Sequence, residues 1–173
     1  MVIYFDNSAT TQVSEKAAAK ALEVMRQNYG NPSSLYSLGL AAEKIVQDAR
    51  EKAALAIGAQ AEEIYFTGCG TESNNWAFKG LAEANRKGKK NHLVITAIEH
   101  PAILQTAKAL ENHGYQVSVV MPQKDGRMKA SDLLAKVKEE TLLVSCMHVN
   151  NETGVIQPIA EIGCALAALS HKV

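Results

Sequence analysis

One short segment, rich in glycine and hydroxyl side chains, carries residue types that could bind a phosphate group. It reads Thr67-Gly-Cys-Gly-Thr-Glu-Ser-Asn-Asn75 and follows the apolar run Glu63–Phe66, which predicts a strand. An amphipathic pattern over residues 76–87 predicts a helix after it. Gly70 and Thr71 therefore fall at a strand-to-helix turn. Because a helix begins with unpaired N–H groups and a positive dipole end, this turn could seat a phosphate.

Two further polar groups follow predicted strands. His100 comes after the predicted strand Leu93–Thr96, and Asn151 comes after an apolar strand predicted over residues 141–148. In parallel sheets the carboxyl ends of the strands share an edge where ligands collect. Each residue also has an ordinary explanation, since a histidine at a helix start is often solvated and asparagines often serve their own loop. An imidazole, a carboxamide and a phosphate seat at one edge would together form a cofactor site.

The elements that would position these groups alternate along the chain. Two helices come first, the first capped by Ser14 and the second ended by Gly58. Strands are then predicted at residues 64–66, 93–96, 116–120 and 141–148, and the helices of the chain at residues 15–29, 35–57, 76–87, 101–112, 130–138 and from 158 onward. This alternation predicts an α/β fold with a largely parallel sheet.

Length and composition limit the classes of function. The chain has 173 residues, 47% of them hydrophobic, which suffices for one domain with a core. Eighteen basic and eighteen acidic residues give a formal charge of zero, which argues against a nucleic-acid partner. No signal peptide and no membrane-spanning run is visible, so we expect no membrane partner and a cytoplasmic location.

The cysteines and histidines show no spacing typical of a metal site or a disulfide framework. Cys69, Cys146 and Cys164 are far apart, and the last two are expected to be small buried apolar residues. No metal site is predicted. The glycine segment matches neither a P-loop nor a dinucleotide fingerprint, so a nucleotide cofactor such as NAD is not expected.

Five segments along the chain form an ordered set of motifs. They read Tyr4-Phe-Asp-Asn-Ser-Ala-Thr-Thr11, Gly30-Asn-Pro-Ser-Ser34, Phe66-Thr-Gly-Cys-Gly-Thr-Glu-Ser-Asn-Asn75, Ile98-Glu-His-Pro-Ala-Ile103 and His148-Val-Asn-Asn-Glu-Thr-Gly-Val-Ile-Gln-Pro158. Together they resemble the cysteine desulfurases of the NifS/IscS type, a class V branch of the fold-type I enzymes that use pyridoxal 5′-phosphate (PLP). The resemblance covers the whole chain. It implies a three-layer large domain, with residues 1–15 as a segment near the substrate and residues 16–173 as the amino-terminal part of the PLP-binding domain.

The resemblance also implies roles for single residues. Gly70 and Thr71 would bind the cofactor phosphate. His100 would be a catalytic residue that stacks on the pyridine ring and helps proton traffic. Asn151 would contact both the cofactor, near its 3′ oxygen, and the substrate carboxylate. The substrate side would be completed by a loop with three named positions, Asn7, Ala9 and Thr10.

The reaction implied by the resemblance removes sulfur from L-cysteine and gives L-alanine. The sulfur, held as a persulfide, would pass to an acceptor or scaffold protein for iron–sulfur cluster or thiolated-RNA assembly, and the enzyme would be a homodimer. Two alternatives stay open. The chain could be a half-chain that binds or regulates a full-length desulfurase, or a class V relative such as an aminotransferase or a selenocysteine lyase.

Part of the family pattern has no match in the chain. The resemblance implies an aspartate at the pyridinium nitrogen, a lysine that holds the cofactor covalently and a nucleophilic cysteine, all beyond the last matched segment. Ser170-His171-Lys172 looks like the lysine segment but follows Asn151 by only about twenty residues, so we interpret it as a basic helix end. We therefore expect a sheet incomplete at the carboxyl end, and a chain that alone does not desulfurate cysteine at a useful rate.

Overall fold

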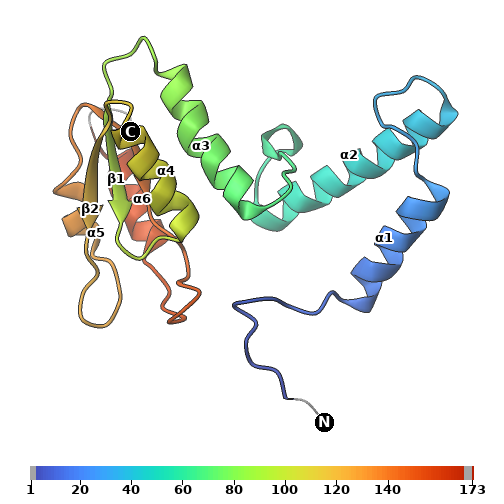
Figure 1. The fold of residues 1–173 in the computed structure, drawn as a ribbon, viewed down its shortest axis with the longest axis horizontal. Helices are drawn as coiled ribbons and strands as arrows, with labels where there is room; N and C mark the ends of the chain where they lie inside the picture. The colour runs from blue at the N-terminus through green and yellow to red at the C-terminus, as the bar shows by residue number, and fades with distance from the viewer. Residues whose placement is uncertain (1–2, 170–172) are drawn as a thin grey trace. The chain divides into compact units, whose positions relative to one another are not determined.

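The computed structural model describes residues 3–169 and residue 173, which fall into two compact units, Met1–Phe66 and Thr67–Val173. The first unit contains α1 (Glu15–Gln27), α2 (Ser37–Ile57) and the 3-10 turn η1 (Ala61–Glu63) (Figure 1). The hydroxyl of Ser14 accepts the N–H of Ala17 at 3.3 Å and so caps α1. Gly58 ends α2 with a φ of 70°, a left-handed conformation that glycine adopts without strain. The predicted cap and stop are both confirmed.

The strand predicted at residues 64–66 is wrong. These residues follow η1 and belong to no strand among the described residues. Arg50 of α2 holds the segment instead, because its guanidinium donates to the carbonyl of Ile64 and lies 5.2 Å from the centre of the Phe66 ring. Three apolar residues carry strand propensity, but a strand forms only where a partner strand is present.

The second unit is built on a parallel sheet. Its described strands are β1 (His92–Thr96), β2 (Gln116–Val120) and β3 (Thr141–Ser145), in the order β2-β1-β3. Both pairings of the central strand β1 are parallel, as predicted from the alternation of strands and helices. β3 ends at Ser145, three residues earlier than predicted, and the chain then turns away into a loop.

Helices cover the two faces of this sheet (Figure 1). They are α3 (Gly70–Ala84), α4 (Pro101–Glu111), α5 (Ala130–Leu134) and α6 (Ile159–Ala167). Successive side chains of a strand point to opposite faces, and β1 follows this rule. Leu93 and Ile95 pack with α3 and α4, whereas Val94 packs with α5 and α6. The second unit is therefore a three-layer α/β arrangement, which confirms the predicted fold class.

A buried histidine joins all three strands at the start of β1. His92 is 1% exposed, and its Nδ1 lies 2.9 Å from the hydroxyl of Thr141 on β3. Its Nε2 lies 2.9 Å from the hydroxyl of Ser118 on β2. Burial lowers the pKa of His92 below 6.5; Lys138 lowers it further, while Glu140 acts in the opposite sense.

We expect the second unit to lose stability as the pH falls below about 6.5. The unfolded chain, with an ordinary imidazole pKa, binds a proton that folded His92 resists, so protonation favours unfolding until the lowered folded pKa is also passed. Urea unfolding at pH 8 and pH 5 measures the effect. His92→Gln should reduce the loss, and His113→Gln, at an exposed site, should not. An equal pH dependence in all three chains would contradict the role given to His92.

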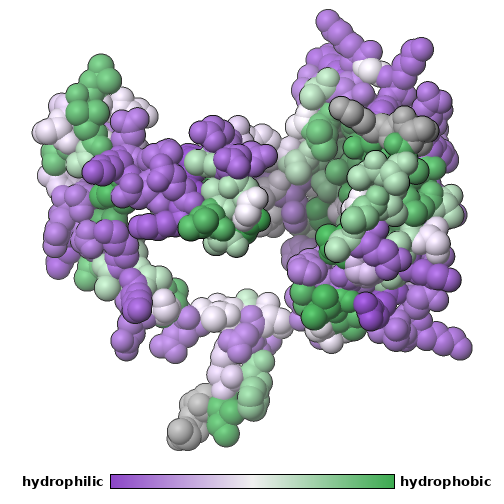
Figure 2. Space-filling model, turned by 180° about the vertical axis from the view of Figure 1, so that it is seen from behind, coloured by the Kyte–Doolittle hydropathy of each residue, from purple (hydrophilic) through white to green (hydrophobic). Residues whose placement is uncertain are grey.

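Apolar side chains remain exposed in both units. α1 has no buried residue. In the second unit, Leu142 and Val144 of β3 line a hollow of about 410 Å³ together with Leu166 of α6, and Figure 2 shows apolar residues gathered on this unit. None of the helices in the described part of the chain is long and apolar enough to cross a bilayer.

Candidate active site

The amino-terminal end of α3 is open. Its N-cap residue, Cys69, makes no side-chain capping bond. Among the described residues, no group accepts the backbone N–H of Gly70 or Thr71. A Cβ added at Gly70 would have no atom within 4 Å. The first turn of α3 therefore presents free donors and empty space, the two features that an anion at a helix start requires.

Glu72 lies in this first turn but does not use those donors. Its carboxylate accepts the N–H of Gly68 at 2.6 Å, so it folds back over the preceding turn. The hydroxyls of Thr67 and Ser73 lie 2.6 Å apart and tie the same turn to the helix. A carboxylate near a helix start is favoured by the helix dipole, so Glu72 is explained by the local structure.

His100 begins α4 and is presented to solvent. It is the N-cap residue, its Nδ1 accepts the N–H of Ala102 at 3.1 Å, and Pro101 occupies the first helical position. Because Nδ1 accepts, the neutral ring carries its proton on Nε2. The side chain is thus oriented by the helix start while its ring remains exposed.

The structure brings two of the predicted residues together. Thr71 and His100 line one hollow of about 490 Å³ between α3 and α4, with Asn75, Lys79 and Ala102 also on its wall. Thr71, at the predicted phosphate turn, and the predicted imidazole thus face the same space, whereas Gly70 is not on its wall. The ammonium group of Lys79 adds a positive charge to that wall, which suits an anionic ligand.

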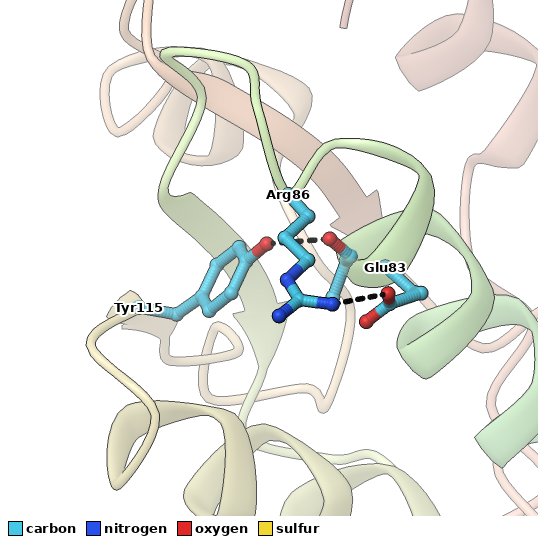
Figure 3. A network of polar contacts seen from close by, with 4 residues as sticks. Glu83, Arg86 and Tyr115 are labelled. Atoms are coloured by element: carbon cyan, nitrogen blue, oxygen red, sulfur yellow. Dashed lines mark hydrogen bonds and ion pairs between the residues drawn. The ribbon is translucent and has the colours of Figure 1, made fainter.

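The far end of α3 is anchored to the sheet. The hydroxyl of Tyr115, just before β2, donates to the carbonyl of Ala82 at 3.0 Å (Figure 3). Beside it, Arg86 and Glu83 form an ion pair at 3.3 Å (Figure 3). This pair is exposed and contributes little to stability. Tyr115 instead helps to fix the direction in which the open end of α3 points.

Asn151 lies outside this hollow, on the loop that follows β3. Its side chain is exposed and donates to the carboxylate of Glu152 at 3.2 Å. The helix that follows β1 packs on one face of the sheet and the helix that follows β3 packs on the other. Where neighbouring strands lead to helices on opposite faces, a crevice opens at their carboxyl ends, and ligands bind there. His100 and Asn151 follow β1 and β3, two neighbouring strands of this kind.

The residues predicted for the substrate side belong to the first unit. Asn7, Ala9 and Thr10 are exposed. The hydroxyl of Tyr4 donates to the carbonyls of Asp6 at 2.7 Å and of Thr10 at 3.0 Å, so their segment forms a local turn. Their role stays a prediction. Ser170–Lys172, the segment compared with the lysine motif, lies outside the described residues.

A buried carboxyl group beside His100 was not predicted from the sequence. Glu99 is 7% exposed and accepts the hydroxyls of Thr96 at 3.0 Å and Ser145 at 3.1 Å. Burial raises its pKa. The carboxyl group ties the end of β1 to the end of β3, the two strand ends that present His100 and Asn151. Of the two hydroxyl partners of Glu99, only Thr96 is close in the sequence, three residues earlier, and could have been suspected from the sequence.

The cysteines differ partly from expectation. Cys146 is half-buried, and burial, with a smaller effect of Glu99, raises its pKa to about 11. It is therefore a thiol at neutral pH. Cys164 was expected to be buried and is exposed, because α6 turns Ile162 and Leu166 toward the core and Cys164 away from them. Within the described residues, no group of three His, Cys, Asp or Glu side chains could hold a metal ion.

The residues present fit the phosphate and ring of PLP. The uncapped start of α3 supplies backbone N–H donors, the hydroxyl of Thr71 adds a side-chain donor, and glycine at position 70 leaves room for phosphate oxygens. His100 offers a flat neutral ring on the wall of the same hollow. The donor set suits an anion at one end and an aromatic ring at the other.

Comparison with known proteins gives consistent results. The class V aminotransferase family profile matches residues 3–171. The cysteine desulfurase IscS of Methanosarcina thermophila is 47% identical over 162 residues, which are 93% of this chain and 40% of that protein. The chain therefore spans less than half the length of this relative.

Solved structures agree with the sequence relatives. A structure described as a NifS-like protein has a TM-score of 0.91 and 41% identity, over 95% of this chain and 45% of that chain. SspA in complex with cysteine has a TM-score of 0.90 and 35% identity, over 95% of this chain and 47% of that chain. The chain thus belongs to the class V aminotransferase family, and it resembles the NifS- and IscS-type members of that family.

Proposed function

We propose that this chain supplies the phosphate-binding and ring-stacking side of a PLP site in a cysteine desulfurase. Proteins of its family and its named relatives depend on PLP. The observation that carries the proposal is that Thr71, at the uncapped start of α3, and His100 line one hollow. The substrate would be L-cysteine and the product L-alanine. Its sulfur would pass to an acceptor or scaffold protein, and the active form would be a homodimer.

Each residue has a distinct task in this proposal. The amides of Gly70 and Thr71, with the Thr71 hydroxyl, hold the phosphate. His100 would stack on the pyridine ring and, through Nε2, could hold or release a proton at the substrate side. Asn151 would donate to the ring oxygen and to the substrate carboxylate, and Asn7, Ala9 and Thr10 would approach the substrate. When bound, PLP supplies the electron withdrawal, and the protein supplies orientation and electrostatics.

A second candidate is a binding or regulatory role toward a full-length desulfurase. Two features favour it: β3 is an edge strand of the sheet in the described part of the chain, and Leu142, Val144 and Leu166 line an apolar hollow beside it. An edge strand beside apolar surface can accept a further strand. Size-exclusion chromatography of the chain mixed with such an enzyme tests this role, and co-elution supports it.

Another class V chemistry, transamination or selenocysteine lysis, is distinguished from desulfuration by identifying the reaction products.

The PLP proposal is tested by titrating the ¹⁵N-labelled chain with PLP. We expect the amide resonances of Gly70 and Thr71 to shift and saturate, because their N–H groups are free to bind the phosphate. We also expect borohydride treatment to leave no fixed lysine adduct in the intact mass, and cysteine to give no steady alanine or sulfide. Unchanged amide resonances would refute the phosphate seat. An adduct at one lysine, Lys172 included, or steady turnover would refute the noncovalent, inactive state.

A further inference from the structure

The adjacent asparagines after β3 have different surroundings. Asn151 is exposed, whereas Asn150 is 9% exposed and is bonded at both ends of its carboxamide. Its Oδ1 accepts the backbone N–H of Glu152 at 3.0 Å and of Thr153 at 2.9 Å, and the hydroxyl of Thr153 at 3.1 Å. These bonds close the loop on itself. The oxygen end of Asn150 thus fixes the conformation in which Asn151 is presented.

The nitrogen end of the same carboxamide leaves the loop. Nδ2 of Asn150 donates to the carbonyl of Ile98 at 3.2 Å, across 52 residues of sequence, and lies 3.3 Å from the sulfur of Met147. Ile98 is two residues before His100. One buried side chain therefore links the loop that carries Asn151 to the turn that carries His100. Glu99 adds a parallel link through Ser145.

We propose that Asn150 is a positioning residue that holds the Asn151 loop at a fixed place relative to His100. The carboxamide of Asn151 and the ring of His100 are then set before the cofactor arrives, which lowers the ordering cost of binding. This inference rests on the proposed function, because it assigns the two linked residues to one PLP site. Asn150 itself touches no reacting atom in this arrangement.

Asn150→Asp removes the link with little change of shape. The carboxylate still accepts the N–H groups of Glu152 and Thr153, but it cannot donate to Ile98 and repels that carbonyl. In the chain without cofactor, the NMR signals of the His100 ring and the Asn151 side chain should shift. PLP affinity should fall about tenfold, the effect expected for the loss of one aligned hydrogen bond.

Thr153→Val is the matched control. It removes a hydroxyl that bonds Oδ1 of Asn150 within the loop and leaves the Nδ2 bond to Ile98 in place. The His100 signals of the cofactor-free chain should stay at wild-type values, because the bond from Nδ2 to Ile98 is kept. If Asn150→Asp unfolds the chain, Asn150→Ser replaces it, because a serine hydroxyl can accept the loop amides but is too short to reach Ile98.

The outcomes separate this inference from the proposed function. Unchanged His100 signals in the Asn150 variants, or unchanged PLP affinity where the wild-type chain binds PLP, would overturn the positioning role and leave the PLP site standing. If the wild-type chain does not bind PLP, the proposed function fails. The cofactor-free signals of His100 then still decide the link, since a shift in Asn150→Asp but not in Thr153→Val supports it and no shift overturns it.

Discussion

Gly70→Asp should weaken PLP binding by about 100-fold or more, because a carboxylate about 4 Å from a phosphate costs several kcal/mol at an effective dielectric near 20. The new side chain would occupy the space beside the free N–H groups of α3, where a Cβ meets no atom within 4 Å. It would also bond those N–H groups itself, as aspartate does at helix starts. Isothermal titration calorimetry with PLP measures the change.

Gly70→Ala is the control for this prediction. Its methyl group meets nothing within 4 Å, and φ at Gly70 is not positive, so alanine is accommodated without strain. PLP affinity in Gly70→Ala should therefore stay within about threefold of wild type, since no contact is lost. Equal affinities in Gly70→Asp and Gly70→Ala would show that the phosphate binds elsewhere.

Leu133→Ala should lower the free energy of unfolding of the second unit by about 3 kcal/mol. Leu133 is fully buried at 0% exposure and packs in the cluster that contains Val94 and Ile162. The loss combines the transfer energy of the missing methyl groups with the cavity that they leave. Trp76, the single tryptophan of the chain, lies in α3 of the same unit, so its fluorescence follows urea unfolding there.

Leu81→Ala is the matched control, because it makes the same change in another helix of this unit at a side chain that is 41% exposed. Its cost should stay below about 1 kcal/mol, since little buried area is lost. A loss in Leu133→Ala no larger than in Leu81→Ala would mean that the α5 layer does not support the sheet. The order of the two losses, not their absolute size, is the decisive result.

Local signals predicted most of the fold. Ser14 and Gly58 act through their own backbone neighbours, and the strand at residues 116–120 was predicted with its observed bounds. The errors arose where contacts with residues distant in the sequence determine whether a strand forms and where it ends. The predicted strand at residues 64–66 finds no strand partner in the described part of the chain. β3 stops at Ser145, where Glu99 accepts the Ser145 hydroxyl and the chain enters the Asn150 loop.

The candidate site also contains residues that could be predicted from the sequence and residues that could not. The sequence pattern placed Thr71 and His100 at helix starts, and the structure shows both lining one hollow, although the strand predicted just before Thr71 is not a strand. The tasks of Glu99, His92 and Asn150 were not predictable. Each depends on a partner 46 to 52 residues away in the sequence. A single sequence carries no information on such pairings. The buried Asn150 and the exposed Asn151 are adjacent residues of one type, so only the folded loop distinguishes them.

The central position of β1 also determines when the second unit can fold. His92 meets Ser118 after 26 residues of chain and Thr141 after 49. Parallel pairing at such separations must overcome loop-closure entropy before its hydrogen bonds form. During synthesis, therefore, α3 and β1 leave the ribosome well before both neighbours of β1 have been made. At that stage the residues that pack around Val94 are also absent. The second unit is expected to order late, once β3 and the Ile162 side of α6 have emerged to complete the cluster around Val94.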